Sequence, residues 1–120
     1  MEILNGIDIE RISRFESLIL KDSFMAGVYT RAEIKSILES PIPQRRAASM
    51  FSAKEAVSKA LGRGLYGIKP RDIEICHDEN GRPVVKLYND ALSLYGGYSV
   101  SLSISYKDDY TVTSCLAYKE

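Results

Sequence analysis

The residues with the clearest chemical potential lie in one segment, residues 51–62 (FSAKEAVSKALG). Residues three and four apart are neighbours on a helix. One helical face is therefore predicted to carry Phe51, Glu55, Ser58, Lys59 and Gly62. A carboxylate beside a lysine suits a magnesium–phosphate site, because Mg²⁺ takes one or two carboxylates and completes its shell with water and phosphate oxygens, while the lysine neutralises phosphate charge. The alternative is a plain Glu55–Lys59 ion pair, worth about 0.2–0.5 kcal/mol.

A second carboxylate stands near the start of the chain, in residues 5–10 (NGIDIE). Asp8 is expected where a first strand turns into a first helix. An aspartate in that place ordinarily caps the helix by accepting a backbone hydrogen bond. The functional interpretation is a second metal ligand, which another element brings to Glu55.

The charge of the chain is unevenly distributed. The formal net charge is zero, which argues against general nucleic-acid binding. Residues 31–71 nevertheless carry nine basic and three acidic groups. Such a patch suits a polyanionic ligand or an acidic protein partner, and a solvated helix surface is the alternative. Arg45 and Arg46 are candidates for phosphate contacts, with a solvated first helical turn as the alternative.

These side chains must be positioned by the surrounding elements. Residues 2–9 are typical of an apolar strand, and Ile9, Ile12, Phe15 and Ile19 have helical spacing over residues 9–20. Thr30 and Glu33 form a capping box for a helix over residues 30–39. An alanine-rich helix is predicted from Gln44 to Leu61, ended by Gly62 and Gly64.

Two hairpins are expected in the second half. Asp72–Cys76 and Pro83–Tyr88 flank an Asn80-Gly81 turn, and residues 89–95 are predicted as a short helix or turn. Alternating residues from Val100 to Ser105 lead to a turn at residues 107–109 and a returning strand over residues 110–118. This order is typical of an α+β fold in one domain, residues 1–120. Cys76 and Cys115 are expected to be buried free thiols.

Several of these segments together resemble the holo-acyl-carrier-protein synthase family, which are phosphopantetheinyl transferases. The match follows the family's order and spans nearly the whole chain. Its segments are Gly6-Ile7-Asp8-Ile9, Thr30-Arg31-Ala32-Glu33, residues 51–62, Asp72-Ile73-Glu74-Ile75, Gly81-Arg82-Pro83 and Ser103-Ile104-Ser105. The Phe-x-x-Lys-Glu-Ala-x-x-Lys-Ala-x-Gly element is highly specific, whereas Gly-Ile-Asp and Gly-x-Pro alone are not.

The resemblance implies a fold and a set of site residues. The implied fold is a single-domain phosphopantetheinyl transferase-like α+β fold, with an antiparallel sheet packed on a long helix, assembled as a homotrimer with active sites between subunits. Asp8 and Glu55 match the residues that hold Mg²⁺, and Lys59 matches a lysine that contacts phosphate. Arg14 matches a residue that meets the carrier protein. The implied coenzyme A site includes Phe51, Ser58, Lys59, Gly62, Gly81, Arg82, Pro83, Ser103 and Tyr106.

The resemblance also implies the reaction. The carrier serine attacks the phosphate that bears the pantetheine arm of coenzyme A, and adenosine bisphosphate leaves. Glu55 or a metal-bound water takes the serine proton. The implied setting is fatty acid biosynthesis in the cytoplasm, with coenzyme A as co-substrate and acyl carrier protein as partner. The sequence itself indicates neither nucleic acid nor membrane as a partner, because its net charge is zero and no stretch approaches the roughly 20 apolar residues of a membrane helix.

Two positions depart from the family pattern. Tyr106 stands where the family usually has histidine, and a tyrosine of pKa about 10 cannot act as an acid or base near neutral pH. Met50 stands where the family usually has arginine, and Arg45 or Arg46 is expected to compensate. These departures favour an alternative function, a non-catalytic module that binds carrier protein or coenzyme A.

Overall fold

The computed structural model describes residues 1–62 and 67–120. Its elements, in chain order, are β1 (Glu2–Arg11), the 3₁₀ helix η1 (Ile12–Arg14), α1 (Phe15–Leu18), α2 (Asp22–Val28), α3 (Arg31–Glu39), α4 (Pro43–Ala60), η2 (Pro70–Asp72), β2 (Ile73–His77), β3 (Pro83–Leu87), α5 (Asn89–Tyr95), β4 (Ser99–Lys107) and β5 (Tyr110–Lys119). The fold is α+β, as expected.

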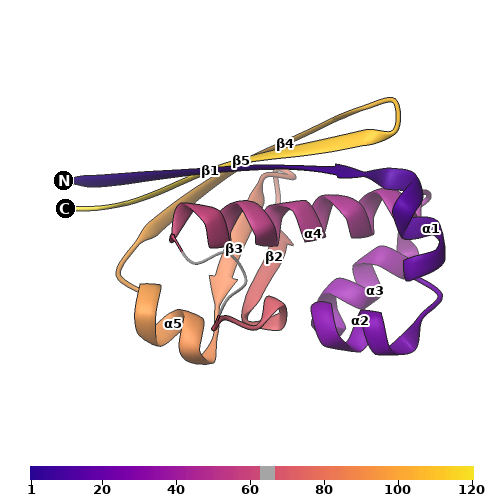
Figure 1. The fold of residues 1–120 in the computed structure, drawn as a ribbon, viewed down its shortest axis with the longest axis horizontal. Helices are drawn as coiled ribbons and strands as arrows, with labels where there is room; N and C mark the ends of the chain where they lie inside the picture. The colour runs from indigo at the N-terminus through magenta and orange to yellow at the C-terminus, as the bar shows by residue number, and fades with distance from the viewer. Residues whose placement is uncertain (63–66) are drawn as a thin grey trace.

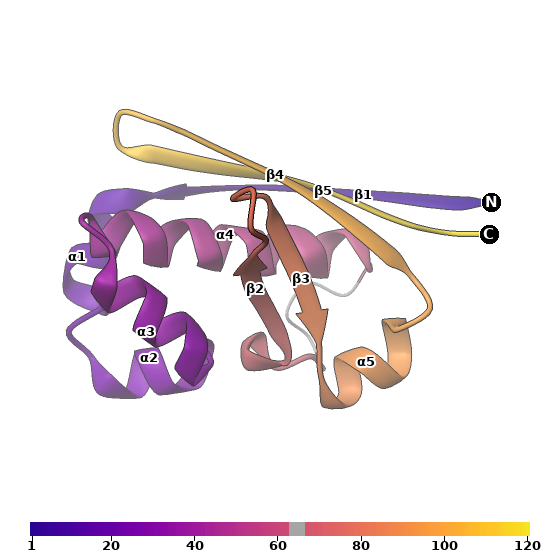
Figure 2. The same ribbon diagram turned by 180° about the vertical axis from the view of Figure 1, so that it is seen from behind.

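The long helix α4 lies at the centre of the fold (Figure 1). A three-stranded antiparallel sheet of order β1-β5-β4 covers one side of it. The helices α1–α3 and the β2–β3 hairpin with α5 lie on the other side (Figures 1 and 2). Both chain ends lie at the same end of the sheet (Figure 1). The alanine face of α4 (Ala53, Ala56, Val57, Ala60) is buried, as its composition predicts.

The first strand is longer than the sequence predicts. β1 continues to Arg11, which pairs with Tyr110 of β5, so the helix expected over residues 9–20 was wrong for its first turn. The apolar spacing of this segment also fits a strand, and pairing with β5 extends the strand. Asp8 consequently lies inside β1, and its expected role as a helix cap is also wrong. The helix α2 was not predicted.

The other predicted elements are confirmed, with bounds that differ by a residue or two. Thr30 and Glu33 form the capping box of α3. α4 ends at Ala60, and Gly62 follows with a φ of +85°, a backbone conformation that favours glycine. Gly64, the second predicted helix terminator, lies outside the described residues. Both cysteines are free; Cys115 is buried, and Cys76 is only partly buried.

A buried ion pair fixes α4 against its neighbours. The Lys54 side chain is 0 % exposed, and its Nζ lies 2.8 Å from Glu33 Oε1 on α3. The same ammonium donates to the backbone carbonyls of Pro70 and Ile73. Glu33 accepts in turn from the backbone N–H groups of Thr30 and Ile75. All three donors of Lys54 are satisfied, so the network sets how α4 is rotated.

Candidate active site

The site begins where β1 crosses α4. Gly6 lies against the backbone of α4, and a Cβ there would overlap the Ala56 carbonyl oxygen and come within 2.6 Å of the Ala60 nitrogen. Only glycine allows this approach. Alternation along the strand then turns Asp8 and Glu10 toward α4 on the same side as Gly6. This contact brings Asp8 to the predicted face of α4.

Lys59 is the ionic partner of Asp8. Lys59 Nζ lies 3.1 Å from Asp8 Oδ1 and 3.2 Å from the Ile7 carbonyl oxygen. The Lys59 side chain remains 49 % exposed, whereas that of Asp8 is 8 % exposed. Among the described residues, Lys59 makes no ion pair with Glu55. The alternative of a Glu55–Lys59 helical pair is therefore wrong.

Glu55 and Glu10 surround Asp8 with further negative charge. Burial raises the pKa of Glu10 to about 7, and the neighbouring Asp8 contributes to the rise. Burial and the charge of Asp8 also raise the pKa of Glu55. Arg14 forms an ion pair with Glu10 at 2.9 Å and opposes the rise at both glutamates. Three carboxylates therefore crowd together, and at Glu10 and Glu55 burial and the charge of Asp8 outweigh the nearby positive charges.

The donor set fits a divalent cation that keeps several non-protein ligands. The second carboxylate oxygen of Asp8, Oδ2, is buried and has no hydrogen-bond partner among the described residues. Within the described residues, no group of three His, Cys, Asp or Glu side chains is arranged to enclose a metal ion. Magnesium needs no such group, because one or two carboxylates suffice when phosphate and water complete its shell.

The other predicted residues of the α4 face have different environments. Phe51 is partly buried among Phe15 and Phe24, with the guanidinium carbon of Arg14 5.6 Å from its ring centroid. Ser58 is fully buried, and its hydroxyl donates to the Lys54 carbonyl at 2.7 Å. The structure therefore separates Ser58 from the exposed face that the helical spacing predicts for it.

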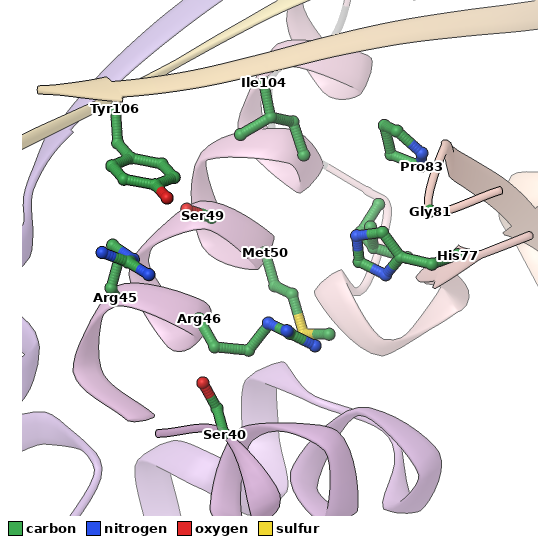
Figure 3. A pocket seen from close by; sticks show the side chains of 11 residues that line it. Ser40, Arg45, Arg46, Ser49, Met50, His77, Gly81, Pro83, Ile104 and Tyr106 are labelled. Carbon is green, nitrogen blue, oxygen red and sulfur yellow. The ribbon is translucent and has the colours of Figure 1, made fainter. Parts of the chain in front are cut away.

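A cationic pocket lies on the other side of α4. It has a volume of about 270 Å³ and opens between α3, α4, β4 and the β2–β3 hairpin. Figure 3 shows Arg45 beside Tyr106, and Arg46 extending toward His77. The Arg45 guanidinium carbon lies 4.1 Å from the Tyr106 ring centroid. The lining residues are Ser40, Arg45, Arg46, Ser49, Met50, Ile75, His77, Gly81, Pro83, Ile104 and Tyr106.

The remaining predicted residues lie apart from these two groups. Arg82 and Ser103 line a shallow hollow with Pro83, which also borders the cationic pocket. Ser103 is exposed on the face of β4 opposite the buried Leu102. Gly62 is exposed beyond the end of α4. Within one chain, the predicted coenzyme A residues therefore do not converge on one cavity.

The cluster of Asp8, Glu10 and Glu55, called the Asp8 group below, and the cationic pocket lie on opposite sides of α4. Glu55 and Arg46 are nine residues apart, which is 2.5 helical turns, so their side chains leave opposite faces. The sheet repeats this separation, because Asp8 lies on edge strand β1 and Tyr106 on edge strand β4, with β5 between them. One ligand cannot contact both groups of a single chain without crossing α4 and β5.

Two residues of these sites were missed by the sequence reasoning. Glu10 had a usable signal, because it stands two residues after Asp8 and would share its face if the strand continued. The expected helix over residues 9–20 concealed this relationship. His77 had no local signal, because its neighbours in the pocket come from α4 and β4, distant in the sequence.

Comparison with known proteins shows what this chain is similar to. The sequence model of the 4′-phosphopantetheinyl transferase superfamily matches residues 5–115. The holo-[acyl-carrier-protein] synthase of Caldicellulosiruptor saccharolyticus is 40% identical over 119 residues, which cover 96% of this chain and 95% of the relative.

Solved structures of the same name share the fold. The holo-[acyl-carrier-protein] synthase of Neisseria meningitidis has a TM-score of 0.85 and 33% identity, covering 97% of this chain and 98% of that one. The synthase of Bacillus anthracis, in complex with coenzyme A (3′,5′-ADP), has a TM-score of 0.82 and 28% identity, covering 98% and 96%. The α+β phosphopantetheinyl transferase-like fold of the chain, with an antiparallel sheet packed on a long helix, is thereby confirmed.

Proposed function

The chain belongs to the 4′-phosphopantetheinyl transferase superfamily, as a holo-[acyl-carrier-protein] synthase, and we propose that it uses magnesium to transfer the phosphopantetheine arm of coenzyme A to an acyl carrier protein. Residues 1–120 act as one transferase domain, and the reaction supplies carrier protein for fatty acid synthesis. The main support for this proposal is the environment of Asp8. Its carboxylate is buried, with Lys59 on one oxygen and no partner among the described residues on the other.

The chemistry is assigned to the group around Asp8. Asp8 and Glu55 hold the magnesium ion, which when bound neutralises charge on the phosphate oxygens of coenzyme A. Lys59 is half-exposed beside Asp8, so its ammonium can also reach a phosphate oxygen in transit. The Asp8 contact orients Lys59, and this preorganisation lowers the cost of placing charge at the reacting phosphate.

The transfer follows as a substitution at phosphorus. The carrier serine Oγ forms a bond to the phosphorus that bears the pantetheine arm. The bond from that phosphorus to the bridging oxygen breaks, and adenosine 3′,5′-bisphosphate leaves with that oxygen and its electron pair. The serine proton passes to a base of the site or to water. Lys59 stabilises the charge that develops on the phosphate oxygens.

The nucleotide part of coenzyme A is assigned to the cationic pocket. Arg45 and Arg46 supply positive charge, and Tyr106 supplies a ring and a hydroxyl. Met50 lies in the same pocket as both arginines, which supports the expected compensation for its missing charge. The volume of about 270 Å³ is below the roughly 300–1,000 Å³ of pockets that enclose a drug-sized ligand. The pocket therefore holds only part of coenzyme A.

A complete site is proposed to form between two copies of the chain. The Asp8 group and the cationic pocket face opposite sides of α4, so neighbouring copies can bring one group to the other. A repeated contact of unlike surfaces closes into a ring, and a homotrimer is the proposed ring. The outer face of the sheet supports assembly, because Ile7 and Ile9 are 62% and 60% exposed there.

Arg14 is proposed to meet the carrier protein. Its side chain is 53% exposed at the edge of the Asp8 group, where its pair with Glu10 lies. An acidic surface on the carrier would compete with Glu10 for this guanidinium. The carrier serine would then approach the Asp8 group from the side that Arg14 occupies.

The direct test is intact-mass measurement of an apo acyl carrier protein after incubation with this enzyme, coenzyme A and Mg²⁺. The expected result is a mass gain of one phosphopantetheine arm per carrier. Asp8→Asn should abolish the gain, because it removes the metal-binding charge while keeping the shape. Glu16→Gln is the matched control, since Glu16 is an exposed acid on α1, and it should transfer normally.

Two further observations complete the test. Circular dichroism should show that Asp8→Asn is folded, so that its inactivity reflects the site. Absence of any mass gain with several carriers, despite measurable coenzyme A binding, would contradict the proposed transfer and favour the binding module.

A further inference from the structure

The cationic pocket contains a residue to which no role has been assigned. His77 ends β2 and is the one histidine of the chain. Its ring lies across the pocket from Tyr106, and the Arg46 side chain extends toward it between the two walls (Figure 3). Two guanidinium groups and one imidazole thus face a common space.

The charges around this space are unbalanced. No carboxylate occurs among the described residues that line the pocket. Arg45 and Arg46 have no carboxylate partner within 4.0 Å among the described residues. Arg46 donates to the Ser36 hydroxyl at 2.7 Å, and Arg45 stacks on Tyr106. These contacts position the two cations without neutralising them, as in a site built for an anion.

The groups that face His77 show how it responds to this surplus. Partial burial lowers the pKa of His77, and the charge of Arg46 lowers it further. Asp78, the next residue, opposes this effect. Its carboxylate is held in the hairpin turn, where Oδ1 accepts from the backbone N–H groups of Asn80 and Arg82 at 2.9 Å each. Tyr106 faces the pocket from β4 and brings an aromatic ring and a hydroxyl rather than a carboxylate.

We propose that His77 is a phosphate-recognition residue: with Arg45 and Arg46 it binds the 3′-phosphate monoester of coenzyme A, and it discriminates against coenzyme A that lacks this phosphate. The inference rests on the proposed use of coenzyme A and adds a specificity determinant to it. A phosphate monoester is a compact dianion that three converging cations can contact together. Its charge favours the imidazolium, so phosphate binding draws a proton onto His77.

The proposal also accounts for Tyr106. Where the family usually has histidine on β4, this chain has a ring that supports Arg45. The pocket nevertheless contains an imidazole, which enters from the β2–β3 hairpin on the opposite wall. The turn hydrogen bonds of Asp78 hold that hairpin end in place. The pocket thus has a titratable imidazole on the β2–β3 hairpin instead of on β4.

The first experiment measures dissociation constants for coenzyme A and for 3′-dephospho-coenzyme A at about pH 6.5 and 8.5, above the phosphate's own ionisation near pH 6. His77→Gln should weaken coenzyme A binding by about tenfold at the lower pH, as expected for one charge-assisted hydrogen bond. Binding of 3′-dephospho-coenzyme A should be unchanged. His77→Arg should restore coenzyme A affinity and remove its pH dependence. Arg71→Gln, an exposed charge that does not line this pocket, is the matched control and should behave as wild type.

The second experiment uses the single histidine as its own reporter. The imidazole proton signal of His77 is followed by NMR against pH, with adenosine 3′,5′-bisphosphate or with adenosine 5′-monophosphate as probe. The bisphosphate should raise the pKa of His77 by about one unit or more, whereas the monophosphate should not.

The outcomes separate this inference from the proposed function. The role of His77 is overturned if the bisphosphate leaves the pKa of His77 unchanged, even when transfer to the carrier is intact. It is also overturned if His77→Gln weakens the binding of coenzyme A and of 3′-dephospho-coenzyme A equally. A clear response to the 3′-phosphate in a protein that transfers nothing supports the recognition role and contradicts the transferase assignment.

Discussion

Lys59 Nζ lies 3.1 Å from Asp8 Oδ1, although the two residues are 51 positions apart and Glu55 is only one helical turn from Lys59. The long-range pair exists because Gly6 lets β1 lie directly on α4. It leaves Glu55 and the second oxygen of Asp8 available to a cation.

Replacing Lys59 should separate metal binding from transfer. Lys59→Met removes a positive charge from Asp8, so Mg²⁺ should bind tighter, by about fivefold after solvent screening. Transfer should fall by a factor of 100 or more, because charge on the phosphate in transit is no longer neutralised. Calorimetry with Mg²⁺ and the carrier mass assay measure the two effects. Weaker Mg²⁺ binding in the variant would contradict the assigned geometry.

Gly6→Ala should damage both stability and activity. The added Cβ would overlap the α4 backbone at Ala56 and Ala60, which cannot move as a flexible side chain could. The expected loss is about 1–3 kcal/mol of unfolding free energy, with a loss of transfer because Asp8 is displaced. Urea denaturation and the mass assay are the measurements.

Gly27→Ala is the matched control for that substitution. Gly27 lies in α2, and a Cβ there meets nothing within 4 Å. Alanine in a helix should therefore be neutral or stabilise by about 0.4–1 kcal/mol. Equal effects of the two substitutions would contradict the close approach of β1 to α4.

Lys54→Met should be among the most destabilising single substitutions. It leaves the Glu33 carboxylate buried without its cation, which costs about 3–5 kcal/mol in comparable buried pairs. Denaturant unfolding measures the loss. Lys35→Met, an exposed lysine on α3, should change stability by less than about 0.5 kcal/mol. A loss below about 1 kcal/mol in Lys54→Met would show that the pair does not hold α4 in place.

The Asp8 group should make the stability of the metal-free protein depend on pH in a defined direction. The pKa of Glu10 is raised from 4.5 to about 7 by burial and by Asp8. A carboxyl group with a raised folded-state pKa stabilises fully below its unfolded value, and this stabilisation is lost as pH rises through the folded value. The unfolding free energy of wild type relative to Glu10→Gln should therefore fall between pH 4.5 and about 7.

This pH effect is measured by urea denaturation in the presence of a chelator. Magnesium should reduce the fall, because a bound cation favours the ionised carboxylates. A wild-type advantage that grows with pH across this window would be the opposite of the expected sign.

A site shared between copies should allow two inactive variants to complement each other. Asp8→Asn damages the Asp8 group, and Arg46→Ala damages the cationic pocket. Co-expressed as differently tagged subunits in equal amounts, they should regain about a quarter of wild-type transfer, because each site then draws one intact group from each of two copies. No recovery in purified mixed assemblies would place the whole site within one chain.

The sequence by itself determined the elements that carry local signals. Thr30 and Glu33 predict the start of α3, alanines predict α4, and Asn80-Gly81 predicts the β2–β3 turn, because each pattern acts within a few residues. The resemblance carried by residues 51–62 also determined the superfamily. The roles it implies for the individual site residues stay predictions.

Only the tertiary structure decided which groups meet. β1 extends past Ile9 because β5, about a hundred residues later, supplies its hydrogen-bond partners. That extension places Asp8 beside Lys59 and turns Glu10 to the same side. Ser58, predicted on the exposed face, is buried because the packing around α4 covers it. His77 joins Arg46 only because the β2–β3 hairpin packs against α4. Helical and strand periods specify which side of an element a residue takes, whereas partners from distant segments are specified only when the core packs.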